Sequence, residues 1–300
     1  MDRVKLSENL EFSRLTHGMW RLAEWNMSAD ATLHFIEECL ELGITTFDHA
    51  DIYGNYSCED LFGTALAQKP SLRSKLQLVS KCGIKLISSK HPEHKIKYYD
   101  TSKEHIVTSA EQSLKNLRTD HLDLLLIHRP DPYMNPEEVA EAFTQLKEEG
   151  KVIHFGVSNF TPSQFNMLQS YLGFPLVTNQ IEISVMAIES FTNGTIDHCL
   201  EKRIPPMAWS PLEGGKFFHA SDERGLRLRS TIEAIAKDLQ VDSIDQILYA
   251  WLLNHPARII PIVGSGNIDR VRSAVKSADI QLSRQQWFEI LQSTTGKAVE

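Results

Sequence analysis

The chain has 300 residues, of which 42% are hydrophobic and 23% are charged, a balance typical of a globular protein with a sizeable core. Its formal net charge of −8 argues against general nucleic-acid binding, which needs a basic face. No run is apolar for long enough to span a bilayer, and the N-terminus lacks the pattern of a signal peptide. We therefore expect a cytoplasmic protein with no membrane partner.

Short β-type runs alternate with helical stretches along the whole chain. The predicted strands lie at residues 16–22, 44–48, 76–81, 122–127, 152–158, 176–180, 205–210 and 259–263. Residues 1–15 are expected to form a hairpin. A final helix is expected from Ser283 onwards, with Trp287 as a packing anchor.

Two of the intervening helices carry clear start signals. Asn135 supplies an N-cap before Pro136, and Gly150 ends that helix. Thr161 and Gln164 form a capping box around a proline at the first helical position.

Eight strands, each followed by a helix, predict an α/β fold: one (β/α)8 barrel domain over residues 1–300, with an N-terminal hairpin and an extra C-terminal helix. A doubly wound sheet is the alternative. A dinucleotide-binding sheet of that kind would carry a glycine-rich turn after its first strand, where this chain has AEWNMSADA. The four cysteines are scattered without a CxxC pair, so neither a disulfide framework nor a cysteine zinc site is expected.

Polar side chains follow the predicted strands at the point where each one ends. In a (β/α)8 barrel these positions meet at the C-terminal rim, where the chemistry of such folds takes place. Asp48 and Tyr53 follow the second strand, Lys81 ends the third, and His128 follows the fourth. Later strands bring Ser158, Asn159, Gln180, Trp209, Ser210, Gly264, Ser265 and Gly266 to the same rim.

This group of side chains indicates acid–base chemistry on a carbonyl or an alcohol. A phenol has an ordinary pKa of about 10, and an adjacent ammonium is expected to lower it. Tyr53 is therefore the candidate general acid, with Lys81 adjusting its pKa and Asp48 holding the lysine in place. His128 would orient the substrate oxygen by hydrogen bonding.

Four segments in order along the chain resemble the signatures of the aldo-keto reductases: DHADIYG, LLLIHRP, KVIHFGVSNF and TNQIEIS. The resemblance covers essentially the whole chain and implies an NAD(P)H-dependent carbonyl reductase. It implies Asp48, Tyr53, Lys81 and His128 as a catalytic tetrad. It also implies that Ser158, Asn159 and Gln180 bind the nicotinamide carboxamide. Trp209 stands where the family usually has a tyrosine stacked on the nicotinamide ring.

Further cofactor contacts follow from the same resemblance. They comprise Met19, Trp20, Asp48, Ser210, Leu212, Gly214, Gly264, Ser265, Gly266 and Arg270. The segment GSGNIDRVRSA at residues 264–274 occupies the family's site for the adenosine 2′-phosphate, and a guanidinium at position 270 suits a phosphate. However, Gly264 replaces a frequent lysine, while Ser273 and Ala274 replace a frequent Glu-Asn pair. NADPH is expected in preference to NADH.

The substrate pocket is expected to be lined by Trp20, Trp25, Tyr53 and His128 and to accept several aldehydes or ketones. No metal site is expected, because the spacing of His91, His94 and His105 is not that of a zinc site with a carboxylate, and these residues read as solvated loop histidines.

Three polar residues near the tetrad receive no role from the sequence: His49, Asp51 and Arg129. Arg129 has three possible places, since it could pair with Asp51, pair with Asp131 or line the pocket.

Two other functions stay open at this point. A metal-dependent barrel hydrolase could use Asp48, His49 and His128, although the remaining strand ends offer few further ligands. An NADPH-binding regulatory subunit with slow turnover is the other alternative. The oligomeric state is not readable from the sequence, and a monomer is compatible with it.

Overall fold

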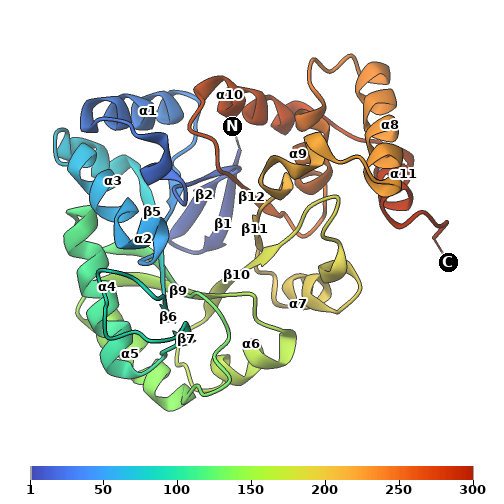
Figure 1. Ribbon diagram of the computed structural model, residues 1–300. Helices are drawn as coiled ribbons and strands as arrows, with labels where there is room; N and C mark the ends of the chain where they lie inside the picture. Colours follow the sequence, from blue (N-terminus) through green and yellow to red (C-terminus); the bar gives the residue numbers. More distant parts are fainter. Residues whose placement is uncertain (1, 300) are drawn as a thin grey trace.

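The computed structural model describes residues 2–299, and its centre is a closed barrel of eight parallel strands (Figure 1). The strands are β3 (Thr16–Gly18), β4 (Thr46–Asp48), β5 (Gln77–Cys82), β8 (Leu122–Ile127), β9 (Val152–Ser158), β10 (Leu176–Glu182), β11 (Met207–Trp209) and β12 (Ile260–Val263). Their order around the barrel follows the chain, with β12 closing onto β3. The predicted (β/α)8 fold is confirmed.

Four predicted strands are shorter in the structure than in the sequence interpretation: the second and eighth begin one or two residues later, at Thr46 and Ile260, and the first and seventh lose more. The first ends at Gly18 rather than at residue 22, and a short 3₁₀ turn follows at Leu22–Trp25. The seventh covers Met207–Trp209, because Pro205 and Pro206 have no N–H for the ladder and Ser210 leaves it with a positive φ of 51°.

The predicted N-terminal hairpin is present, formed by β1 (Arg3–Ser7) and β2 (Leu10–Ser13). Its apolar side chains, including Val4 and Phe12, pack in one cluster with inward-facing barrel residues such as Leu124, Leu126 and Ile260. The hairpin thus closes one end of the barrel interior, so the site must lie at the opposite end, where the strands finish.

Helices surround the barrel in a ring (Figure 1). They are α1 (Ala29–Glu41), α2 (Tyr53–Tyr56), α3 (Cys58–Leu66), α4 (Lys103–Leu117), α5 (Pro136–Glu148), α6 (Pro162–Gln169), α7 (Thr195–Lys202), α9 (Ile244–Leu253) and α10 (Ile268–Lys276). The predicted start signals operate as expected. Asn135 accepts a hydrogen bond from the N–H of Glu137, and Thr161 forms its capping box with Gln164.

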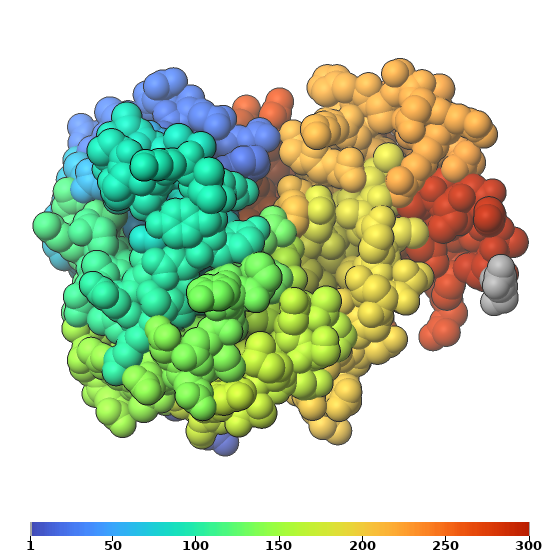
Figure 2. All heavy atoms as spheres, turned by 60° about the horizontal axis from the view of Figure 1, so that its bottom comes forward, coloured from blue at the N-terminus to red at the C-terminus, as the bar shows by residue number. Residues whose placement is uncertain are grey.

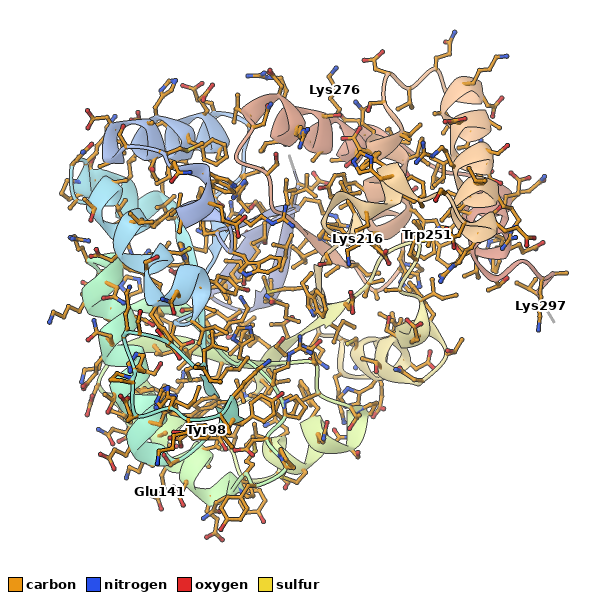
Figure 3. All side chains as sticks on the ribbon, in the orientation of Figure 1. Tyr98, Glu141, Lys216, Trp251, Lys276 and Lys297 are labelled. Carbon is orange, nitrogen blue, oxygen red and sulfur yellow. The ribbon has the colours of Figure 1, made fainter. Side chains whose placement is uncertain are left out.

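Two further helices pack on each other outside this ring: α8 (Glu223–Asp238) and α11 (Arg284–Thr295) (Figure 1). The C-terminal helix was predicted, but α8 was not. Trp251, labelled in Figure 3, stacks on Trp287 with ring centroids 4.9 Å apart. Each indole N–H donates to the other residue's carbonyl, at 3.1 and 3.0 Å. Trp287 is therefore the packing anchor that the sequence predicted.

The long segment after β5 folds back over the rim as a second small hairpin, made by β6 (Ile84–Lys85) and β7 (Tyr98–Tyr99). In the space-filling view this segment lies at the surface of the molecule (Figure 2, blue-green). Within residues 2–299, no helix combines the length and apolar character needed to cross a membrane. All four cysteine thiols are free and buried.

Candidate active site

Lys81 is the centre of the candidate site. Its Nζ lies 2.8 Å from Asp48 Oδ2, 3.0 Å from the Tyr53 hydroxyl and 2.7 Å from the carbonyl oxygen of His49. The lysine side chain is fully buried, and the Asp48 side chain is 3% exposed. The structure thus brings together three members of the predicted tetrad, from β4, β5 and the start of α2.

The charge on Lys81 is kept by its partners. Burial alone would lower the pKa of this ammonium, but Asp48 and Tyr53 more than offset that effect, so its pKa is raised above the ordinary value. A buried ammonium therefore points at the phenol oxygen throughout the neutral range.

The pKa of Tyr53 shifts in the direction opposite to the expected one. Burial raises the pKa of this phenol, and the Lys81 ammonium only partly offsets the rise. The expectation of a lowered pKa is therefore wrong for the protein by itself, because it considered the charge of the lysine without the loss of solvent. The phenol keeps its proton at neutral pH, as a proton donor must.

His128 completes the predicted tetrad from the end of β8. Its ring meets that of Tyr53 edge to face, with centroids 5.9 Å apart. Burial, reinforced by the Lys81 charge, holds the pKa of His128 well below its usual range. The imidazole is therefore neutral, with one N–H to donate. Its Nδ1 is buried without a hydrogen-bond partner among the described residues.

A chain of hydrogen bonds extends from Asp48 across the rim. The side-chain Nε2 of Gln180 donates to Asp48 Oδ1 at 2.8 Å. The backbone carbonyl of Gln180 accepts from Ser158 Oγ at 2.9 Å. Asn159 donates to Ser158 Oγ at 2.7 Å and accepts from the Trp209 indole N–H at 2.9 Å. The residues implied to bind the nicotinamide thus form one hydrogen-bonded network with Asp48, Lys81 and Tyr53.

Arg129 and Asp51 have definite positions in the structure. The Arg129 guanidinium lies over the Trp209 ring, 5.4 Å from its centroid, and within residues 2–299 it forms an ion pair with neither Asp51 nor Asp131. Asp131 instead accepts from Thr101 Oγ1 at 2.8 Å, and Asp51 accepts from Ser109 Oγ at 2.8 Å. Burial raises the pKa of Asp51 to about 7.

The turn after β11 has the shape expected of a place where backbone approaches a ligand. Ser210 and Gly214 both have positive φ, of 51° and 63°. A Cβ on Gly214 would lie 3.2 Å from Arg21 Nη2, so this guanidinium lies beside the turn. Leu212 is partly buried below it, against the core. Arg21 is a candidate anion ligand that sequence reasoning missed, although it directly follows the implied contacts Met19 and Trp20.

The glycine segment after β12 leads into α10. Gly266 packs so closely on Trp25 that a Cβ would lie 2.5 Å from the indole, which leaves room only for glycine. The Ser265 carbonyl lies 3.0 Å from His17 Nε2, and Gly264 is exposed. Among residues 2–299, Arg270 forms no ion pair and is exposed, whereas its neighbour Arg272 is paired with Asp269.

Two of the aromatic residues expected to line the pocket differ in their surroundings. Trp20 is 55% exposed at the rim, as an open pocket wall requires. Trp25 instead packs on His17 and Phe35, with ring centroids 5.8 and 5.7 Å away, and under Gly266. Its contacts place it below the glycine segment, and its place in the wall of the substrate pocket stays a prediction. Met19 is fully buried, and its N–H donates to the Asp48 carbonyl at 2.9 Å.

The hydrolase alternative has no support in the geometry. Asp48 is engaged by Lys81 and Gln180, and the His49 ring faces Phe62 at 4.5 Å between centroids. The interpretation of the other histidines as solvated loop residues also needs correction. His105 lies in α4, and His94 is buried with 7% of its surface exposed.

Comparisons with known proteins show the family of this chain. The model of the Aldo/keto reductase family matches residues 14–294. The uncharacterized oxidoreductase YcsN of Bacillus subtilis (strain 168) is 54% identical over 99% of both chains. The 6-dehydroglucose reductase of Agrobacterium fabrum (strain C58 / ATCC 33970) is 44% identical over 100% of both chains.

A solved structure gives the same result at the level of the fold. The thermostable aldo-keto reductase Tm1743, in complex with the inhibitor epalrestat, superposes with a TM-score of 0.83 at 26% identity. The match covers 98% of this chain and 100% of the other. This chain therefore belongs to the aldo/keto reductase family of oxidoreductases.

Proposed function

We propose that this protein reduces the carbonyl group of a small molecule to an alcohol, with NADPH as the hydride donor. The observation that carries the proposal is the buried ammonium of Lys81, which lies 3.0 Å from the Tyr53 hydroxyl and 2.8 Å from the Asp48 carboxylate. A phenol that keeps its own proton beside a permanent positive charge is suited to protonating an oxygen that becomes negative during a reaction.

The side chains divide the work as follows. Tyr53 donates its proton to the carbonyl oxygen as negative charge develops there, and the resulting phenolate is stabilised by Lys81. Asp48 keeps the lysine charged and in place. Neutral His128 donates its N–H to the substrate oxygen and so orients the carbonyl toward the phenol.

The residues around the rim fit a bound dinucleotide. NADPH would supply the hydride that reaches the carbonyl carbon. The glycine segment leads directly into α10 after Asn267, so the positive end of this helix would lie beside a phosphate bound there. Exposed Arg270 and the guanidinium of Arg21 are candidate partners for the adenosine 2′-phosphate and for the pyrophosphate.

The relatives, rather than the pocket walls, support a proposal for the substrate class. A full-length relative at 44% identity is named 6-dehydroglucose reductase, and 6-dehydroglucose is a polyhydroxylated aldehyde. Arg129 lies over Trp209 at the rim and offers donors to sugar hydroxyl groups. We therefore place polyhydroxylated aldehydes first among the carbonyl compounds to be tested.

The test is the carbonyl-dependent loss of NADPH absorbance, measured with 6-dehydroglucose, simple aldehydes and aromatic ketones. The Tyr53→Phe variant should lose about 100-fold to 10,000-fold in turnover at saturating substrate, because the proton donor is gone. Its affinity for NADPH, measured by fluorescence quenching, should change little. Near-full turnover of this variant would contradict the proposed role of Tyr53.

Cofactor preference has its own measurement. Turnover efficiency with NADPH should exceed that with NADH, and Arg270→Ala should reduce the former while leaving the latter nearly unchanged. Arg272→Ala is the matched control, because that guanidinium is already paired with Asp269. Equal efficiency with both cofactors in the native protein would contradict the preference for NADPH.

A further inference from the structure

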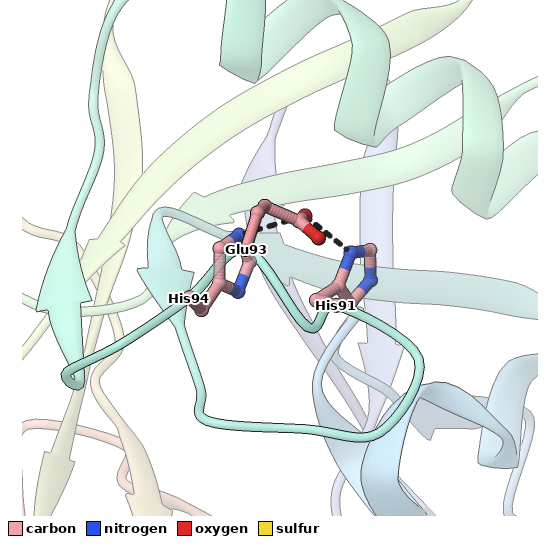
Figure 4. A group of neighbouring side chains, drawn as sticks. All are labelled: His91, Glu93 and His94. Carbon is pink, nitrogen blue, oxygen red and sulfur yellow. Dashed lines mark hydrogen bonds and ion pairs between the residues drawn. The ribbon is translucent and has the colours of Figure 1, made fainter.

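Three side chains outside the catalytic tetrad converge in the long segment after β5. Glu93 Oε1 lies 3.2 Å from His91 Nδ1 and 3.4 Å from His94 Nε2, as Figure 4 shows. The three candidate ligand atoms lie within 4.8 Å of one another, and within residues 2–299 no other group of His, Cys, Asp or Glu side chains meets this condition. The spacing H-x-E-H did not reveal this in the sequence, because the turn of the loop brings the side chains together.

The hydrogen bonding of His94 leaves a place for a positive charge at this point, either a metal cation or a proton on Nε2. Its Nδ1 lies 2.9 Å from the Leu86 carbonyl oxygen, which can only accept, so Nδ1 must carry a proton. In the neutral ring Nε2 then presents a lone pair toward the carboxylate of Glu93. Two acceptors that face each other repel unless a positive charge lies between them. The His94 side chain is only 5% exposed, so water cannot easily relieve this arrangement.

Two of the three ligand-atom distances are close to those around a zinc-type ion. Zinc bonds of about 2.0–2.2 Å to nitrogen and oxygen in a tetrahedron place neighbouring ligand atoms about 3.3–3.6 Å apart. The two separations from Glu93 Oε1 are 3.2 and 3.4 Å. The contact of His94 Nδ1 with a backbone carbonyl is also the usual support of a metal-bound histidine, since it fixes the ring and its tautomer.

We propose that His91, Glu93 and His94 bind one divalent cation of the zinc type, with water at the fourth position. Glu93 is 63% exposed and His91 is 38% exposed, so the ion can enter from solvent. Four free thiols are buried elsewhere and do not compete for it in the folded protein.

The ion would fix the loop against the segment that carries Tyr53. The His91 ring meets that of Tyr56 at 4.5 Å between centroids, and Lys90 Nζ donates to the Tyr56 carbonyl at 2.9 Å. The Tyr56 hydroxyl accepts from the Leu86 N–H at 2.9 Å. Metal binding would therefore close residues 86–94 into a rigid bracket around Tyr56, at the rim but apart from the catalytic tetrad.

The experiment is a zinc titration of chelator-treated protein against a chromophoric competitor, repeated with cobalt as a spectroscopic probe. Native protein should bind one ion per chain and give the intense visible absorption of four-coordinate cobalt. Glu93→Gln and His94→Gln should each weaken binding by at least about tenfold, since loss of even an outer partner costs a metal site that much. His34→Gln is the control, because among the described residues exposed His34 forms an ion pair only with Glu38, at 3.7 Å.

Loop protection provides a second measurement that does not depend on activity. Trypsin can cleave after Lys90 and Lys95, on either side of the ligands. Zinc at ten times its dissociation constant should slow these cleavages by about tenfold in native protein and leave them unchanged in Glu93→Gln. If native protein binds zinc no more tightly than the His94→Gln variant, the positive charge at this point is a proton and the proposal is wrong.

Discussion

Lys81 is the residue on which the polar part of the site depends. It satisfies a carboxylate, a carbonyl and a phenol at once, while its side chain is fully buried. A charge in this position contributes little net stability by being present, since its desolvation offsets its pairing. Its removal, however, leaves the Asp48 carboxylate buried without a counter-charge.

The Lys81→Met variant should therefore lose about 3–5 kcal/mol of unfolding free energy, measured by denaturant titration. Lys85→Met is the matched control. Lys85 pairs with Asp100 at 3.8 Å with both side chains partly exposed, so it should cost less than about 1 kcal/mol. Adding Asp48→Asn to Lys81→Met should recover part of the loss. A Lys81→Met protein as stable as the control would contradict this account of the buried pair.

Asp51 should make stability depend on pH in the opposite sense to an ordinary carboxylate. Burial raises its pKa to about 7, from an ordinary 3.8, so between these values the folded chain holds a proton that the unfolded chain has released. Stability from this group is complete below about pH 4 and is lost as the pH rises to about 7. Asp51→Asn should thus be more stable than native protein at pH 8. The expected gain in unfolding free energy is about 1–3 kcal/mol, which is less than the full pKa shift implies because part of Asp51 reaches solvent.

The measurement is denaturant unfolding of both proteins at pH 8 and pH 6. The advantage of Asp51→Asn should be smaller by about a third at the lower pH, where the folded carboxyl is mostly protonated. Asp242→Asn, which changes an exposed carboxylate 3.2 Å from Lys276, should show the same small difference at both. An Asp51→Asn protein that gains nothing at pH 8 would show that the native carboxyl is already ionised without cost.

Contacts between distant residues mark the limit of what single positions in the sequence reveal. The position of Gln180 at a strand end was readable, but its bond to Asp48 joins residues separated by 132 positions. The direction of the Tyr53 pKa shift was not readable either, because it depends on whether burial outweighs one neighbouring charge. The sequence identified which side chains reach the rim, and the packing determines what they do there.

At the scale of elements, the strands were predictable and one helix was not. Buried parallel strands read as short apolar runs that end in polar residues, and all eight were found at nearly correct positions. The helix α8 lies between β11 and α9, in a stretch where the barrel repeat predicts one helix instead of two. The helix α8 packs on α11, which lies about 50 residues later in the chain. The sequence around α8 therefore does not indicate which element its apolar face covers.

The attachment of α11 should depend on the paired tryptophans. Trp251 is fully buried, whereas Trp287 is partly buried, and each donates its indole N–H to the other's carbonyl. Trp287→Ala should cost about 2–4 kcal/mol of unfolding free energy. Packing against Trp251 is lost, and a shift of α11 would leave the Trp251 indole N–H without its acceptor. Hydrogen exchange should rise first in residues 284–295.

Phe288→Ala, on the same helix, is the control, since Phe288 is half-buried and lies beside Trp287 without joining the hydrogen-bonded pair. It should cost clearly less. Equal losses from the two variants would mean that general apolar contact, and not the tryptophan pair, holds α11 in place.

At the scale of the whole molecule, buried histidines set the lower pH limit of stability. Burial lowers the pKa of His17 to about 4, that of His49 to about 3 and that of His105 to about 4, from an ordinary 6.5. Below pH 6.5 the unfolded chain therefore binds protons that the folded chain refuses. Their contribution is complete above about pH 6.5 and is lost as the pH falls toward 4.

Each of these groups lowers the free energy of unfolding by on the order of 3 kcal/mol over that range. Their sum is comparable with the 5–15 kcal/mol unfolding free energy of a typical domain. Asp51 opposes them with a smaller gain. The protein should thus unfold between about pH 6 and pH 4, as followed by circular dichroism. His49→Leu tests the cause, because neither His49 ring nitrogen has a hydrogen-bond partner among the described residues and an apolar side chain suits the space beside Phe62. This variant should move the midpoint of acid unfolding to lower pH. The His34→Gln variant is the control, because His34 is exposed, and it should leave the midpoint unchanged. Acid transitions that coincide in the two variants would show that other groups drive the unfolding.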